Sequence, residues 1–440
     1  MGFRDIGRQI ESGARLASIG GRRVLGVDTN PVPADWTHIT KVDPETEKAM
    51  PLAFSLYLSH TDAVSVGGSR GVTAENTEDT FGFLSPLAVP AFHEPSAARH
   101  VTKQTSEEMA FLAVPEVLNG DSEALIGVLG EGLDYVREEL GPEMIEDKIG
   151  ISLGDGALGK RAVDAVAAYL MHEAVFEAYI IMNPDSAAAR EANVTEADLL
   201  TPDEARKRAL AAEYHLESEV VYLEYSGTFG GDEAVSLLTE IDDAVSWGRI
   251  WYGGGIDSRE KAETVLAAGA DTVVVGDIFH DIATVERDLV TAARDQFDAS
   301  SDRSEVQEWV SEQLTVAESP AAKYLSTIPS VENPETRATE YLTTAVLLAL
   351  SVDDLGSSLE TPTASELTRN VREWATAESV DTASDETVTA TTTSAETVTG
   401  DAGAREIDSE LIQKLALALL GKRFGVESSD GFSGDHLAVE

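Results

Sequence analysis

The sequence predicts an α/β protein: a TIM (β/α)8 barrel with a C-terminal helical extension and a disordered linker. Three apolar runs that end in glycine follow one another at regular spacing, at 220–227 (Val-Val-Tyr-Leu-Glu-Tyr-Ser-Gly), 249–256 (Arg-Ile-Trp-Tyr-Gly-Gly-Gly-Ile) and 271–278 (Asp-Thr-Val-Val-Val-Gly-Asp-Ile). In such barrels the loops and helix N-termini after the last two strands bind phosphate through backbone N–H groups. The ends of these runs therefore predict a binding site.

The remaining barrel strands are predicted from apolar, β-rich runs that end in Gly, Pro or Asp, at 37–44, 63–69, 87–95, 109–119 and 176–184. Segments of helical period lie between the strands, at 162–173, 202–214, 232–245 and 258–268, the last with Ser258 as N-cap. This alternation indicates a parallel sheet, and eight units indicate a closed barrel. The long, irregular connection at 120–172 predicts an inserted excursion.

The chain is divided accordingly into an N-terminal arm (1–36), the barrel (37–299) and three further segments. A helical extension at 300–374 holds short amphipathic helices at 306–314, 340–350 and 364–374, which prolines separate. Residues 375–405 consist largely of Thr, Ser, Ala, Asp and Glu, which predicts a disordered linker. Residues 406–440 form a last helix at 408–424, which Gly425 ends, and a tail. We expect this helix to dock on the barrel or on a partner.

The charge balance is strongly acidic, with 79 Asp and Glu against 32 Lys and Arg, a net charge of −47 and a pI of about 4.3. Nucleic acid binding is excluded because the phosphate backbone would be repelled. An acidic surface of this kind indicates adaptation to molar salt, and the alternative is an acidic mesophilic protein. The chain has no cysteine and no apolar leader, so we expect a soluble cytoplasmic protein without disulfides or thiolate metal sites.

Two strand ends carry candidate chemistry. Lys41 and Asp43 are two residues apart, so both side chains are expected to point into the barrel mouth. Ser69 follows two glycines at the end of the second strand, where its hydroxyl is suited to complete a magnesium site with water and diphosphate oxygens. The alternatives are a plain salt bridge for the first pair and an ordinary glycine turn for the second.

Two other patterns carry no function. Residues 154–161 nearly match a nucleotide-binding P-loop, but Arg161 stands where Ser or Thr is required. The eight histidines lack metal-ligand spacing, and we expect structural or surface roles for most of them.

Taken together, these motifs resemble the geranylgeranylglyceryl phosphate synthases and their heptaprenyl relatives. The resemblance covers about 37–281 and rests on motifs at strand ends in a fixed order: Lys-x-Asp-Pro (41–44), Gly-Gly-Ser (67–69), 115–119, Asn-Pro-Asp-Ser (183–186), Tyr-Leu-Glu-Tyr-Ser-Gly (222–227), Tyr-Gly-Gly-Gly-Ile (252–256) and Ala-Asp-Thr-Val-Val-Val-Gly (270–276). That family joins a prenyl diphosphate to the 3-hydroxyl of sn-glycerol 1-phosphate, the first ether bond of archaeal membrane lipids. The resemblance thus implies a prenyltransferase that uses geranylgeranyl diphosphate, although a C25 or C35 donor remains open.

The resemblance also implies roles for individual residues. Asp43 and Ser69 would hold Mg²⁺, Lys41 would contact glycerol phosphate, and Glu224 would bind its hydroxyls and accept the proton as the ether forms. The residues implied to line glycerol phosphate are Lys41, Tyr222, Leu223, Glu224, Tyr225, Ser226, Gly227, Gly253, Gly254, Gly255, Gly276 and Asp277. Gly253, Gly254, Gly255 and Gly276 would cradle the phosphate through their N–H groups. A dimer and transient membrane contact are further implications.

The sequence departs from the family in two places. Asp277 stands where many relatives carry Asn, and an ionised side chain that pointed inward would repel phosphate. The chain also continues far beyond residue 281, whereas the family is usually barrel only. A divergent paralogue therefore remains open, and so does a non-catalytic barrel that binds a phosphorylated ligand and uses its C-terminal module for regulation or scaffolding. The joint presence of Lys41, Asp43, Ser69 and Glu224 favours the enzyme.

Overall fold

The computed structural model describes residues 28–149, 156–381, 407, 409–426 and 436–439. Eight parallel strands form one sheet in the order β3-β2-β1-β8-β7-β6-β5-β4. Their bounds are β1 His38–Val42, β2 Ala63–Val66, β3 Ala91–His93, β4 Ala113–Val117, β5 Val175–Ile181, β6 Val220–Glu224, β7 Arg249–Gly253 and β8 Thr272–Val275. All eight predicted strands are confirmed, each shorter than its apolar run.

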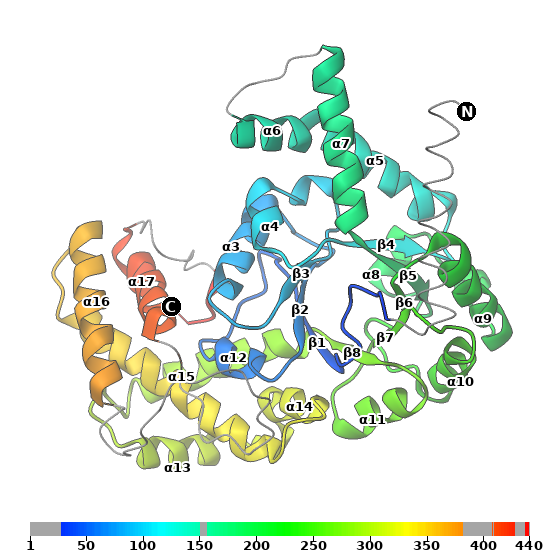
Figure 1. The fold of residues 1–440 in the computed structure, drawn as a ribbon. Helices are drawn as coiled ribbons and strands as arrows, with labels where there is room; N and C mark the ends of the chain where they lie inside the picture. Colours follow the sequence, from blue (N-terminus) through cyan, green and yellow to red (C-terminus); the bar gives the residue numbers. More distant parts are fainter. Residues whose placement is uncertain (1–27, 150–155, 382–406, 408, 427–435, 440) are drawn as a thin grey trace, which may run out of the picture.

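The sheet curves until its two edges meet. A parallel bridge joins His93, at the end of β3, to Leu112, just before β4, and the backbone N–H of His93 donates to the Phe111 carbonyl at 3.1 Å. The predicted barrel is therefore nearly closed, with a short seam between β3 and β4 (Figure 1).

Alternation along the strands separates an inner core from an outer one. One cluster of buried side chains, which includes Ile39, Phe92, Tyr222 and Trp251, fills the barrel interior. The residues between them in the strands belong to a second cluster shared with the surrounding helices. Polar residues on inward positions therefore face the barrel interior, and this places the candidate site.

Helices follow the strands as expected for a (β/α)8 barrel. They are α2 Phe54–Leu58, α3 Ala74–Leu84, α4 Lys103–Glu108, α8 Ala187–Glu191, α9 Pro202–Ala211, α10 Gly231–Asp242, α11 Arg259–Ala267 and α12 Ile278–Ala293. The predicted helices at 202–214, 232–245 and 258–268 correspond to α9, α10 and α11. Ser258 occupies the N-cap position of α11, although its side chain makes no capping bond.

The excursion predicted between the fourth and fifth strands is confirmed. It contains α5 Val128–Tyr135, α6 Gly141–Ile149 and α7 Ala157–Glu173, with π-helical turns at Glu123–Gly127 and Val136–Leu140. Figure 1 shows α6 and α7 projecting beyond the barrel. The near-match to a P-loop falls partly outside the described residues and partly in the first turn of α7, and the nearest described strand before it, β4, ends at Val117.

Residues 28–36 cover the N-terminal end of the barrel. The Asn30 side chain donates to the carbonyls of Glu219 and Trp247 at 2.8 and 3.0 Å, immediately before β6 and β7. Val32 is fully buried in the inner core. The opposite end, where the strands terminate, is left for the site.

The C-terminal extension is helical: α13 Arg303–Gln313, α14 Pro320–Thr327, α15 Pro334–Ser357, α16 Ala364–Asp381 and α17 Ser409–Phe424. Three of these were expected at 306–314, 340–350 and 364–374, and α17 was expected at 408–424, whereas α14 was not predicted. The linker boundary at 375 needs correction, because α16 continues to Asp381 through residues such as Ala375 and Glu378 that favour helix. The rest of the predicted linker, residues 382–405, lies outside the described residues.

The extension docks on the outer face of β1 through α14. Tyr324 Oη and Thr40 Oγ1 are 2.7 Å apart, and His38 Nε2 lies 3.0 Å from Thr327 Oγ1. Tyr324 also packs against Tyr57 of α2, and all of these side chains are buried. The extension therefore shares a core with the barrel.

Candidate active site

A partly buried cation, Lys41, lies in the barrel mouth. Lys41 Nζ donates to both carboxylate oxygens of Glu94, at 3.0 and 3.1 Å. The same carboxylate accepts from Ser65 Oγ at 2.9 Å and from Tyr179 Oη at 2.5 Å. Burial acts to lower the pKa of Lys41, but the carboxylates of Glu94 and Asp43 outweigh it and raise this pKa above its ordinary value. Lys41 is therefore a fixed positive charge, and it faces inward as predicted.

A second carboxyl group lies below this pair. Glu177, on β5, is fully buried, and neither of its oxygens has a hydrogen-bond partner. Burial, together with the nearby Glu94 charge, raises its pKa well above the ordinary range, although Lys41 opposes the shift. Glu177 is therefore held as the neutral acid, and the Lys41–Glu94 pair keeps its balance of one positive and one negative charge.

The loop after β1 is held by a second ion-pair network. Lys48 Nζ lies 2.7 Å from Asp43 Oδ2 and also pairs with Asp277 at the start of α12. The Asp43 N–H donates to His280 Nε2 at 3.0 Å, and His280 Nδ1 lies 3.1 Å from the Ala49 carbonyl. These contacts fix the Nδ1–H tautomer, and burial lowers the pKa of His280, so a neutral imidazole joins α12 to this loop.

Asp277, which stands where many relatives carry Asn, is paired with a lysine. Its side chain is 81% exposed and pairs with Lys48, and although burial acts to raise its pKa, the Lys48 ammonium lowers it below the ordinary value. Its φ of +20° lies at the edge of the left-handed region. The predicted repulsion of phosphate is thus offset by a neighbouring cation that sequence analysis did not single out.

The two predicted magnesium ligands lie on adjacent loops. A side chain on Gly68 would meet Asp43 Cβ at 3.2 Å, so the loop of Ser69 passes directly beside Asp43. Ser69 is exposed, and its N–H donates to Glu45 Oε1 at 3.2 Å. Among the described residues no group of three or more His, Cys, Asp or Glu side chains is arranged to hold a metal ion. The donors present are hard oxygens that suit Mg²⁺ with water and phosphate ligands, but the ion would compete with Lys48 for Asp43.

The end of β6 supplies Glu224 and Tyr222 to the barrel interior. Glu224 Oε1 accepts from the Ser226 N–H at 3.1 Å, whereas Oε2 is buried without a partner. Burial raises the pKa of this carboxyl above its ordinary value, although the Ser226 hydrogen bonds and Lys41 oppose the shift. Glu224 thus offers one oxygen to a ligand in the mouth.

The neighbouring side chains of Leu223 and Tyr225 point elsewhere. Both belong to the outer core between the sheet and the helices, and Tyr225 Oη donates to Glu233 of α10 at 3.1 Å. Alternation along β6 causes this, because residues on either side of an inward position face outward. These two side chains therefore face away from the barrel interior, and the place of Leu223 and Tyr225 among the ligand-lining residues stays a prediction that rests on their backbone groups.

The glycine run after β7 is needed for packing. A Cβ on Gly253 would lie 2.1 Å from Tyr222 Oη, and one on Gly254 would lie 2.5 Å from the Tyr225 backbone. Gly254 and Gly255 also have φ values of +144° and +59°, which favour glycine. Gly253, Gly254 and Gly255 therefore let this loop approach the loop of Ser226 and Gly227 closely. Gly276 lies between β8 and α12, beside Lys41.

A match to known proteins covers the region that contains these residues. The model of the PcrB family matches residues 33–294, well over half of the chain. The chain belongs to the PcrB family. Its relatives include the geranylgeranylglyceryl phosphate synthase of Methanocella arvoryzae, which is 32% identical over 57% of this chain and 93% of that protein. The Halobacterium salinarum protein of the same name is 33% identical over 60% and 96%.

Other relatives of this PcrB-family chain extend the comparison. The heptaprenylglyceryl phosphate synthase of Bacillus cereus is 33% identical over 56% of this chain and 91% of that protein. Among solved structures, the (S)-3-O-geranylgeranylglyceryl phosphate synthase from Thermoplasma acidophilum, in complex with sn-glycerol-1-phosphate, has a TM-score of 0.41 and 19% identity over 56% of this chain and 86% of that one. The family match ends at residue 294, before helices α13–α17.

Sequence analysis missed several residues of this site, notably Glu94, Glu177, Ser65, Lys48 and His280. Glu177 is a lone acid inside an apolar strand, and Glu94 directly follows β3. Both carried a signal, since a carboxyl group at an inward position of a barrel strand is costly unless it serves the site. No sequence pattern indicates that Lys48 pairs with Asp43 and Asp277.

Proposed function

We propose that this PcrB-family chain is a prenyltransferase that joins geranylgeranyl diphosphate to the 3-hydroxyl of sn-glycerol 1-phosphate. The observation that carries the proposal is the barrel mouth, where the fixed cation of Lys41 and the free oxygen of Glu224 lie among glycine-rich loops. A phosphate monoester that carries two hydroxyl groups matches this combination of cation, hydrogen-bond acceptor and backbone N–H donors. The names of the relatives support the same substrate class.

The chain's own residues would divide the work. Lys41 would attract the phosphate of glycerol phosphate, and the N–H groups of Gly254, Gly255, Gly276 and Asp277 would bind its oxygens. Glu224 would bind the glycerol hydroxyls, and its raised pKa makes it a stronger base toward the 3-hydroxyl proton. In the reaction the hydroxyl oxygen forms a bond to the first prenyl carbon, the carbon–oxygen bond to diphosphate breaks, and Glu224 takes the proton.

Asp43 and Ser69 are proposed to hold Mg²⁺, with water and substrate oxygens as the remaining ligands. When bound, the ion supplies charge neutralisation for the leaving diphosphate. Lys48 would then give up its contact with Asp43 while it retains Asp277 as a partner. The pair therefore predicts competition between Mg²⁺ and the Lys48 ammonium at Asp43.

Further parts of the proposal rest on the family resemblance and on composition. They are a dimer, a cytoplasmic and salt-adapted protein, and contact with the membrane only while the donor is collected or the product released. No helix in the described residues has the length and apolarity needed to cross a membrane.

One observation favours a second candidate, a non-catalytic barrel that binds a phosphorylated ligand. Lys48 already neutralises the carboxylate proposed for the metal. A barrel that only bound glycerol phosphate would have no need of Mg²⁺, and its extension would serve regulation or scaffolding.

The deciding experiment measures product formed from labelled geranylgeranyl diphosphate and sn-glycerol 1-phosphate in molar KCl, with and without Mg²⁺. We expect a Mg²⁺-dependent ether product from the wild type and from Asp35→Ala, an exposed control, and almost none from Asp43→Ala. The same assay with C25 and C35 donors sets the chain length. Folded wild type that forms no product with any donor would refute the enzyme and leave the binding barrel.

A further inference from the structure

The C-terminal tail of the chain returns to the loop that follows β1. Leu437 pairs in parallel with Met50: the Met50 N–H donates to the His436 carbonyl at 2.7 Å, and the Ala438 N–H donates to the Met50 carbonyl at 3.2 Å. Leu437 and Val439 are 3% and 2% exposed. These contacts hold the tail beside the loop that follows β1, which contains Lys48.

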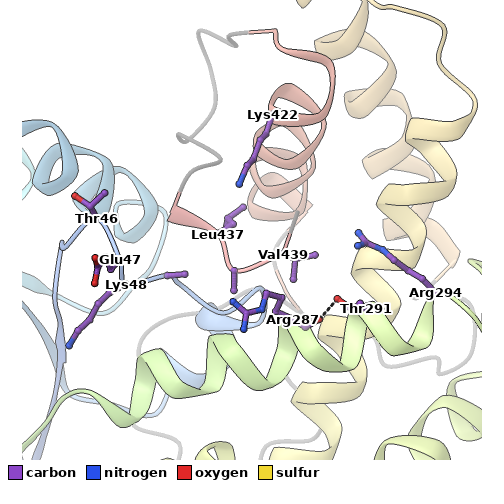
Figure 2. Close-up of a pocket in the computed structure, with 11 residues that line it drawn as sticks. Thr46, Glu47, Lys48, Arg287, Thr291, Arg294, Lys422, Leu437 and Val439 are labelled. Carbon is purple, nitrogen blue, oxygen red and sulfur yellow. Dashed lines mark hydrogen bonds between the residues drawn. The ribbon is translucent and has the colours of Figure 1, made fainter.

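A cavity of about 320 Å³ lies where this tail meets α12 and α17 (Figure 2). Its walls come from four parts of the chain: the loop after β1, α12, α17 and the tail. The lining includes Glu47, Lys48, Arg287, Arg294, Lys422 and Leu437. The cavity is separate from the barrel interior, because Arg287 and Arg294 lie on α12, outside the sheet, and Lys422 lies on α17.

The charge of this lining is opposite to that of the protein. Among the lining residues are four cations, Lys48, Arg287, Arg294 and Lys422, and one acid, Glu47. In the whole chain acids outnumber cations by 79 to 32. In Figure 2 the Lys422 ammonium on α17 extends toward the tail, and Arg287 lies below it on α12. Lys422 and Arg287 thus reach the cavity from separate walls, whereas the Lys48 ammonium is directed away from them, toward Asp43 and Asp277.

The two arginines of the lining already form ion pairs, but with aspartates that lie outside the cavity. Arg294 donates to Asp353 of α15 at 2.7 Å, and Arg287 has a 3.4 Å contact with its exposed neighbour Asp288. Neither aspartate is a lining residue of the cavity. The exposed Arg287–Asp288 pair contributes little, so a bound anion competes for the Arg287 guanidinium at small cost. Arg294 keeps Asp353 through two hydrogen bonds, at 2.7 and 3.3 Å.

We propose that this cavity binds a small anion that carries two or more phosphate groups. Guanidinium groups match phosphate oxygens through paired hydrogen bonds, and cations on separate walls suit a ligand with several charges. The buried Leu437 and Val439 form an apolar side wall that limits the ligand to a compact one. This site does not depend on the function proposed for the barrel mouth.

The site also reaches the barrel mouth through Lys48. This residue lines the cavity, while its ammonium pairs with Asp43 and Asp277. Ala49, the next lining residue, accepts from His280. A ligand in the cavity therefore contacts the same loop that carries the proposed metal ligand Asp43.

The test is calorimetric titration of the full chain with inorganic diphosphate in molar KCl without Mg²⁺. We expect the double variant Arg287→Gln/Lys422→Gln to bind diphosphate at this site at least about tenfold more weakly than the wild type, which corresponds to the loss of about one charge-assisted hydrogen bond. The matched control Arg206→Gln/Lys207→Gln removes one Arg and one Lys, both ion-paired, from α9 and should bind as the wild type does. Unchanged binding by the cavity variant would overturn the proposal.

A third variant separates this site from the barrel mouth. Lys41→Met should retain diphosphate binding in the cavity even if the proposed activity is absent, so failure of one proposal is distinguishable from failure of the other. Should the double variant not fold, hydrogen exchange of the wild type decides the matter. Diphosphate is expected to slow exchange at residues 46–50 and 436–439, and unchanged exchange at both segments would contradict the site.

Discussion

The two faces of β1 differ in what they carry and in what holds them. The inner face presents Lys41, an ion-paired cation whose side chain is 27% exposed to the barrel mouth. The outer face presents His38 and Thr40, which are fully buried and bonded to Thr327 and Tyr324 of α14. Burial lowers the pKa of His38 to about 3, so the contacts on this face are neutral.

This difference shows how one short strand serves two purposes. The charged, partly open face is available to a ligand, whereas the neutral, closed face anchors a helix that lies beyond the family match. The extension thereby supports the strand that bears Lys41 and, through the tail at Met50, the loop that bears Lys48. Substitutions on the inner face should chiefly affect activity, and those on the outer face should chiefly affect stability.

The largest expected effect is on the inner face. Lys41→Met should lower the rate of product formation by about 10²–10³-fold, because it removes the partly buried charge that attracts the substrate phosphate. Steady-state assays in molar KCl measure this change. Lys103→Met, which removes a lysine paired with Asp147 on the excursion, is the matched control and should retain the wild-type rate. Equal rates for the two variants would show that Lys41 has no part in the reaction.

On the outer face the expected effect is on unfolding. Tyr324→Ala should lower the free energy of unfolding by about 3–5 kcal/mol, since it removes a buried ring that packs against His38, Tyr57 and Phe279. Tyr324→Phe keeps the ring and should cost only about 1 kcal/mol for the hydrogen bond to Thr40. Denaturant titration gives both values. If Tyr324→Ala is as stable as the wild type, the extension does not support β1.

The stability of the folded chain is expected to depend on pH through Glu286, a buried residue of α12. Burial raises the pKa of this carboxyl to about 8, although hydrogen bonds from Leu52 and Ala53 oppose the shift. The unfolded chain ionises near the ordinary pKa of 4.5 and the folded chain only near 8, so the wild type should lose stability as pH rises through this window. In Glu286→Gln this loss should be absent, and it amounts to a free energy of unfolding on the order of a few kcal/mol.

Unfolding of both proteins between pH 5 and pH 9 measures this difference. The exposed substitution Glu312→Gln serves as control and should follow the wild-type curve. Parallel curves for the wild type and Glu286→Gln would mean that Glu286 ionises normally in the folded chain.

The smallest expected effect is at Asp277→Asn. Asp277 is largely exposed, so the loss of its pair with Lys48 should change stability by less than about 1 kcal/mol. The freed Lys48 should hold Asp43 more firmly, and a higher Mg²⁺ concentration should then be needed for half-maximal activity. A Mg²⁺ titration of both proteins tests this, and a lower Mg²⁺ requirement in the variant would be the opposite of what the ion-pair network predicts.

The barrel could be predicted from the sequence because each strand is recognised from the pattern of its own few residues. Apolar runs that end in Gly, Pro or Asp located all eight strands, and the two-residue spacing of Lys41 and Asp43 predicted that Lys41 faces inward. The same alternation, applied to β6, places the Leu223 side chain on the outer face of the sheet, among the helices. The carboxyls of Glu94 and Glu177 were missed because acids within apolar runs were not weighed as inward-facing groups.

The extension was less predictable, because its contacts join residues far apart in the chain. Nothing local to Tyr324 and Thr327 indicates that they meet Thr40 and His38, and α14 itself begins at a proline that was taken as a separator. The same holds for the pairing of Leu437 with Met50. Propensity and pattern describe an element but not the partner against which it packs.

The most direct test of the central claim is calorimetric binding of sn-glycerol 1-phosphate to the full chain in molar KCl. We expect that the wild type binds one equivalent, that Glu224→Gln binds at least about tenfold more weakly, and that Thr40→Val on the outer face binds as the wild type does. Absence of binding to the wild type, or equal binding to Glu224→Gln, would contradict the assignment of the barrel mouth as the glycerol phosphate site.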